Sequence, residues 1–151
     1  MTPEAAADPG AVLGIDPGSV RVGVAASDPT RTIATPLAVL SRDPRVLWPA
    51  LSRECRERQV RMLVIGLPLR LDGSEGDAAG SARALGDEAS RALQLPVVLW
   101  DERLTTAQAQ RDLIAAGARR NRRRRAIDSA AATLMLQSWL DWQRARQRTA
   151  R

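Results

Sequence analysis

The sequence contains no histidine, no tyrosine, no phenylalanine and no lysine. Without histidine, neither imidazole catalysis nor metal ligation by imidazole is available. Without tyrosine and phenylalanine, the chain cannot build the aromatic sheet surface on which RRM-type domains stack bases. Any chemistry must therefore come from carboxylates, hydroxyls, arginine, the single thiol or a bound ion.

Cysteine and long apolar runs are also scarce. The one cysteine, Cys55, excludes an intramolecular disulfide and is typical of a protein from a reducing compartment. The first residues lack the basic and apolar regions of a signal peptide, and no run is long enough to cross a bilayer. We therefore expect a cytoplasmic protein with no membrane partner, and 151 residues fit one domain.

Acidic residues are outnumbered by basic ones, and every basic residue is arginine. The formal net charge is +6 and the isoelectric point is near 11.3. Guanidinium groups bind phosphates in a bidentate geometry, so this surface favours polyanions such as nucleic acid. An alanine-rich chain with arginine only is also what a GC-rich coding sequence produces, so charge by itself does not identify the ligand.

The hydrophobic pattern predicts an α/β domain. The first three strands are short and joined by turns, which favours antiparallel hairpins, and Pro36 predicts an edge strand or a bulge for the third. Beyond them, helices and strands alternate, which predicts parallel neighbours joined by crossovers. The predicted strands are 11–16, 20–27, 32–40, 61–68 and 95–100, and the predicted helices between them are 44–58 and 77–93.

The C-terminal part reads as helical. The pattern predicts a helix over 104–117, a basic loop over 118–125 and a second helix over 126–143. We expect residues 1–10 to be flexible, residues 11–143 to form the domain, and residues 144–151 to form a disordered basic tail.

Carboxylates follow the predicted strands in a pattern that suggests a shared site. Asp16 ends the first strand, and Asp101 and Glu102 end the last. Ligands of open parallel sheets gather at the carboxyl ends of strands, so these acids would meet at one rim. Asp128 lies on the apolar stripe of the final helix, where an acid needs a partner. Several acids together favour Mg²⁺ or Mn²⁺, whereas zinc would need His or Cys ligands.

Simpler interpretations exist for each acid taken alone. Asp16 precedes a Pro-Gly pair and suits the first position of a tight turn. Asp101, Glu102 and Asp128 suit the first turn of a helix, where the dipole favours negative charge. The coincidence of all of them at one rim is what favours a site.

Five segments together resemble one known family. The segments LGIDPGSVRVGVAASD, IATPL, VIGLPLRLDGSEG, DERLTT and IDSAAATLMLQSWLD resemble the YqgF (RuvX-like) family, and they occur in order from about residue 12 to residue 141. The family is described as RNase H-fold proteins that resolve Holliday junctions or process the 5′ end of pre-16S rRNA. The resemblance implies an RNase H-like fold with a mixed five-stranded sheet, in which the first three strands are antiparallel and the last two parallel.

The resemblance also implies a site. Asp16, Asp101 and Asp128 would be the catalytic acids that hold the metals, with Glu102 as a fourth participant. Ser74, in the block from Gly66 to Gly76, would help to hold a phosphate, although a serine there also suits a plain turn. Other candidate nucleic-acid contacts are arginines that would otherwise be solvated surface residues: Arg21, Arg103, Arg122, Arg123, Arg124 and Arg125.

The implied function is a metal-dependent nuclease with Mg²⁺ or Mn²⁺ as cofactor. We expect its substrate to be pre-16S rRNA, with a branched DNA junction as the alternative. A junction resolvase needs two active sites across a two-fold axis, so a stable homodimer would favour DNA. Two other classes are weaker. The IDPGS hairpin also resembles that of sugar kinases and actin-like ATPases, which need a second lobe, and a binding module without catalysis would gain nothing from buried acids.

Overall fold

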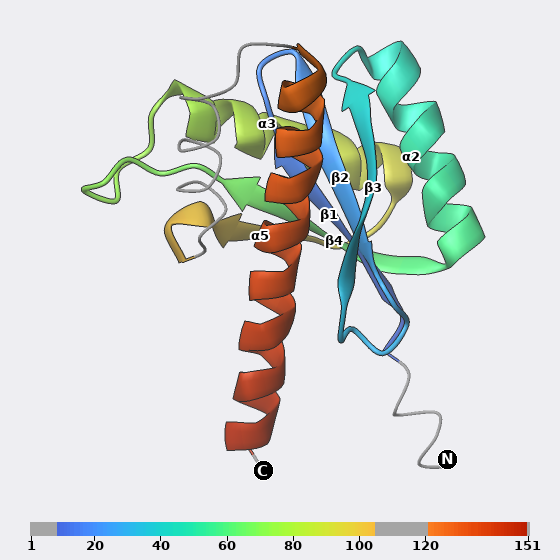
Figure 1. Cartoon of the computed structure of the whole chain (residues 1–151), viewed down its shortest axis with the longest axis vertical. Helices are drawn as coiled ribbons and strands as arrows, with labels where there is room; N and C mark the ends of the chain where they lie inside the picture. Colours follow the sequence, from blue (N-terminus) through green and yellow to red (C-terminus); the bar gives the residue numbers. More distant parts are fainter. Residues whose placement is uncertain (1–8, 105–120, 151) are drawn as a thin grey trace.

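The computed structural model describes residues 9–104 and 121–150, with side chains described for 9–103 and 129–150. The predicted helix over 104–117 and the first eight residues lie outside these ranges, apart from Leu104. The described chain forms one mixed sheet in the order β3-β2-β1-β4-β5, with helices on both faces (Figure 1). This is the predicted α/β architecture.

The strands pair as the turn lengths between them require. β1 (Ala11–Pro17), β2 (Arg21–Ser27) and β3 (Ala34–Ser41) are joined by short turns and are antiparallel. β4 (Val60–Leu67) and β5 (Val97–Asp101) follow helices and run parallel to β1. The predicted edge position of Pro36 is confirmed, because β3 has one neighbour and its register with β2 shifts between Val24 and Ala25, opposite Pro36.

Helices α2 (Pro44–Arg58) and α3 (Asp77–Leu93) cover one face of the sheet. Asp43 caps α2 by accepting a hydrogen bond from the Arg45 N–H, and Leu47, Leu51 and Cys55 recur every four residues to form the buried stripe. Burial, reinforced by the nearby Glu54 charge, raises the pKa of the Cys55 thiol to about 11. The thiol therefore stays neutral and acts as a core group.

Helix α5 (Asn121–Thr149) covers the opposite face of the sheet. Gly14 in β1 allows its close approach, because a Cβ at Gly14 would lie 2.9 Å from Leu136 Cβ. The short 3₁₀ helix η1 (Glu102–Leu104) directly follows β5. Within the described ranges, no helix combines the length and hydropathy needed to cross a membrane.

Helix α5 is longer than the sequence suggested. Its backbone begins at Asn121, inside the expected basic loop over 118–125, and it continues to Thr149, through most of the expected disordered tail. Both segments are rich in arginine, which has a high helix propensity, and no proline occurs between Asn121 and Thr149. The positive charge that suggested a solvated coil is therefore carried on one continuous helix.

Asp28, in the turn between β2 and β3, makes stability depend on pH. Its partial burial opposes the charged form, but hydrogen bonds from the Ile33 N–H, the Thr30 hydroxyl and the Thr32 N–H outweigh this and lower the pKa of Asp28 to about 2. Because the folded pKa lies below the ordinary 3.8, the stabilisation is complete above about pH 4 and is lost as the pH falls towards 2.

We expect Asp28→Asn to destabilise the protein by about 1 kcal/mol at neutral pH, after allowance for solvent screening. Urea unfolding of both proteins between pH 2 and pH 7 checks this. The difference in unfolding free energy should shrink to near zero at the acid end. A difference that is constant across the range would contradict the assignment.

Candidate active site

Asp16 lies near the carboxyl end of β1 and points to the face that α5 covers. Successive residues of a strand alternate between faces, and Val12 belongs to the apolar cluster packed under α5, so Gly14 and Asp16 share that face. Only 5% of Asp16 is exposed. A charged carboxylate at this depth is costly unless a partner compensates its charge. Asp16 is therefore more than a residue of an exposed turn.

Glu102 reaches the same face from the far side of β4. It follows β5 and is 2% exposed. A Cβ placed on Gly66 in β4 would lie 2.4 Å from Glu102 Oε1, so the Glu102 carboxylate rests directly over the Gly66 backbone. Since Ile15 pairs with Ile65, Asp16 and Gly66 are the next residues along two adjacent strands, about 5 Å apart. Asp16 and Glu102 therefore form a buried pair of carboxylates, which we call the acid pair.

Asp101 points the other way. It shares the alternation of Val97 and Leu99, which pack towards α3, and its carboxylate is bonded to Arg103. The Arg103 guanidinium donates to both oxygens at 2.9–3.2 Å, and this bond holds the pKa of Asp101 below its usual range. Within the described side chains, Asp101 is thus an ion-pair partner of Arg103 and is turned away from the acid pair.

The loop after β4 is tied to Arg103. Arg103 Nη1 lies 3.5 Å from the Leu71 carbonyl oxygen, and the loop is closed by a bridge between Leu69 and Glu75. In this loop the Ser74 hydroxyl and its N–H both donate to Asp72, at 2.6 and 2.9 Å. These bonds are the ones that a turn serine makes, so the structure gives Ser74 a turn role and leaves phosphate binding as a prediction.

The remaining predicted residues are placed less completely. Arg21 begins β2, at the same end of the hairpin as Asp16. The backbone of Asp128 lies on α5 one turn before Ala131 and Ala132, which are buried against the sheet. The side chain of Asp128 and those of Arg122–Arg125 are outside the described residues, so their roles stay predictions.

The acid pair suits a divalent cation. It offers oxygen donors only, it is buried, and Gly66 leaves open the space into which Glu102 projects. Oxygen-only donors match Mg²⁺ and Mn²⁺. Among the described side chains no three metal-ligating residues cluster, so a third acidic ligand would have to come from outside that set, where Asp128 lies.

Comparison with known proteins identifies the family. The family model described as "RuvX: Holliday junction resolvase" matches residues 10–142. The chain belongs to the RuvX family. Among curated relatives, "Putative pre-16S rRNA nuclease" of Rhodopseudomonas palustris (strain TIE-1) is 46% identical over 133 residues, which cover 87% of this chain and 83% of the relative. The Kineococcus radiotolerans protein of the same name is 46% identical over 139 residues, which cover 90% of this chain and 74% of the relative.

Solved structures extend the RuvX fold to a more distant protein. RuvC of T. thermophilus, solved "in complex with Holliday junction substrate", is similar with a TM-score of 0.53 at 14% identity, covering 88% of this chain and 96% of that one. A second T. thermophilus RuvC structure gives a TM-score of 0.52. At this identity the likeness concerns the fold, which it confirms as RNase H-like.

In this RuvX-family chain, sequence reasoning missed the role of Gly66. The GLP motif was recognised, but Gly66 was grouped with the phosphate-binding block. The signal available in the sequence was a glycine inside an otherwise apolar strand, which indicates that another group approaches the backbone closely. The structure then places Gly66 one residue beyond Ile65, the register partner of Ile15.

Proposed function

We propose that this protein is a nuclease that hydrolyses phosphodiester bonds in pre-16S rRNA, at its 5′ end. The observation that carries the proposal is the buried acid pair at the carboxyl end of the sheet, in a basic chain. Water would add to phosphorus as the P–O3′ bond breaks, and the 3′ oxygen would take up a proton. The products would be a 3′-hydroxyl and a 5′-phosphate, and the reaction would take place in the cytoplasm.

Each acid has a proposed part. Asp16 and Glu102 would hold Mg²⁺ or Mn²⁺ together with Asp128, whose place on α5 is one turn before the residues packed on the sheet. Bound divalent ions would supply charge neutralisation at the phosphate and a lowered pKa for water. Asp101, first expected to be a ligand, would instead position Arg103 beside the substrate. Arg103 could then bind a phosphate while remaining anchored.

Two substrates remain to be distinguished by experiment. The curated relatives are named for pre-16S rRNA, whereas the family model and the RuvC structure are named for Holliday junctions. The relatives are far more similar to this chain than RuvC is, so RNA is the proposed substrate. A junction resolvase would require paired active sites in a dimer.

The test is a cleavage assay with purified protein on a labelled pre-16S leader RNA and on a four-way DNA junction, each with Mn²⁺, Mg²⁺ or EDTA. We expect RNA cutting that needs the metal, and we expect Asp16→Asn to lower the rate by at least about 100-fold, the loss expected for several kcal/mol of charge stabilisation. Preferential cutting of the junction by a dimer would show that the substrate is branched DNA and not RNA. If neither substrate is cut, the proposal fails.

A further inference from the structure

The last turns of α5 extend beyond the apolar cluster that fixes the rest of the helix. Its last buried residue is Leu140, and no residue from Asp141 to Ala150 is buried. This end of the helix projects past the sheet (Figure 1). A shallow groove of about 760 Å³ runs along it, with Trp142, Arg146 and Thr149 among its lining residues. The segment is thus ordered surface that the core does not require.

Positive charge is concentrated on this helix end. After Asp141 the sequence contains no acid, while Arg144, Arg146 and Arg148 follow at every second position. Arg144 lies 3.8 Å from Asp141. Within the described part of the chain, Arg146 and Arg148 form no ion pair with a carboxylate. Two guanidinium groups are therefore available for phosphates.

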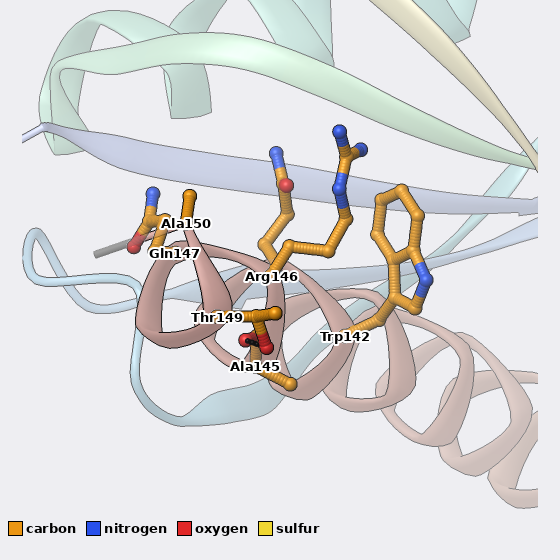
Figure 2. Close-up of a pocket in the computed structure, with 7 residues that line it drawn as sticks. Trp142, Ala145, Arg146, Gln147, Thr149 and Ala150 are labelled. Atoms are coloured by element: carbon orange, nitrogen blue, oxygen red, sulfur yellow. Dashed lines mark hydrogen bonds between the residues drawn. The ribbon is translucent and has the colours of Figure 1, made fainter.

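An exposed tryptophan stands next to these arginines. Trp142 is 41% exposed, and the Arg146 guanidinium lies 4.6 Å from the centre of its ring (Figure 2). The indole holds the guanidinium in place over its own ring, and the outer face of the guanidinium is a planar surface on which a base can stack. Stacking on aromatic rings beside a basic groove is how proteins hold single-stranded nucleic acid.

The helix end and the acid pair lie on the same face of the sheet. Trp142 contacts Trp100, with ring centres 5.1 Å apart. Trp100 pairs with Gly66 across β4 and β5, and the Glu102 carboxylate lies over Gly66. From Asp128 to Arg146 the helix rises about 27 Å at ~1.5 Å per residue. A single strand held at both places would need several nucleotides, within the roughly 4–16 that single-strand binding grooves accommodate.

We propose that Trp142, Arg146 and Arg148 form a second binding site for single-stranded RNA that flanks the cut. The inference rests on the proposed nuclease function only for the identity of the ligand. RNA leaves the acid pair, stacks an unpaired base on the Arg146 guanidinium that Trp142 holds, and places adjacent phosphates on the two arginines. The length and single-strandedness of the flank then become determinants of affinity.

Binding of labelled oligouridine to the full chain in EDTA tests this without any cleavage. Trp142→Ala should weaken binding of an oligomer of about 16 nucleotides by roughly tenfold. The Arg146→Ala/Arg148→Ala variant should reduce the slope of log K against log salt by about 1.4. The arginines are exposed, so this variant remains informative if Trp142→Ala proves unstable.

The matched control is Arg53→Ala/Arg56→Ala, which removes the same charge from exposed positions of α2, across the sheet. It should change the affinity less than twofold. Equal losses in both double variants would show general charge attraction and overturn the site. The inference also fails if the helix-end variants lose as much affinity for blunt duplex RNA as for oligouridine. It fails as well if the only effect of these variants is to convert a dimer to monomers.

Failure here and failure of the proposed function are separable. If RNA is cut but the helix-end variants bind like wild type, the nuclease proposal stands and this site does not. If RNA is bound through the helix end but never cut, the second binding site stands and the nuclease proposal does not.

Discussion

Gly66→Ala is expected to remove nuclease activity while leaving the fold in place. A Cβ at this position would lie 2.4 Å from Glu102 Oε1 and 3.1 Å from Glu102 Cγ and Cδ. Glu102 is 2% exposed, so the side chain must turn away from its present place. A displacement of about 1 Å in a catalytic group costs roughly 100-fold in rate, and the overpacking costs about 1–3 kcal/mol of stability.

Gly80→Ala is the matched control. Gly80 lies inside α3, and a Cβ there would meet no atom within 4 Å. The same chemical change should therefore leave activity intact and stabilise the protein by about 1 kcal/mol through helix propensity. Cleavage rates and thermal unfolding of the two variants check the pair. Wild-type cleavage by Gly66→Ala would mean that the position of Glu102 does not matter.

The second large effect separates two adjacent acids. We expect Glu102→Gln to lower cleavage by at least about 100-fold, because it keeps the shape of the side chain and removes a buried charge proposed to bind the metal. Asp101→Asn should lower it less than about tenfold, because Asp101 is bonded to Arg103 and faces away from Asp16. Single-turnover cleavage of the leader RNA measures both.

Stability provides the control for this comparison. Because Glu102→Gln keeps the shape and volume of the side chain, thermal unfolding should show that the variant remains folded at the temperature of the cleavage assay. Asp101→Asn should be close to wild type, since its ion pair with Arg103 is partly exposed. The reverse order of activities, with Asp101→Asn the less active, would restore Asp101 as a ligand and contradict the described geometry.

Much of the fold could be predicted because its signals are local. Helix 44–58 was predicted to the residue from its apolar positions, and the structure adds the Asp43 cap and Pro44 at the first position, which agree with that start. Pro36 correctly indicated an edge strand. The end of α5 could not be predicted in the same way, because charge density suggests a coil even where arginine favours a helix.

The sequence suggests a candidate set of acids but not their arrangement. The sequence placed Asp16, Asp101 and Glu102 at one rim, yet which of two neighbouring acids turns inward depends on strand alternation carried past the end of β5. Trp100 is buried on the α5 face, and Glu102 shares its alternation. A shift of one residue at the end of β5 would turn Asp101 towards α5 and Glu102 towards α3.

The most direct test of the account is the binding of Mn²⁺ itself, measured by the electron paramagnetic resonance signal of the free ion in titrations of wild type, Glu102→Gln and Asp101→Asn. The account predicts that wild type and Asp101→Asn bind Mn²⁺ similarly, and that Glu102→Gln binds at least about tenfold more weakly. Equal binding by all three proteins, or a loss confined to Asp101→Asn, would contradict it.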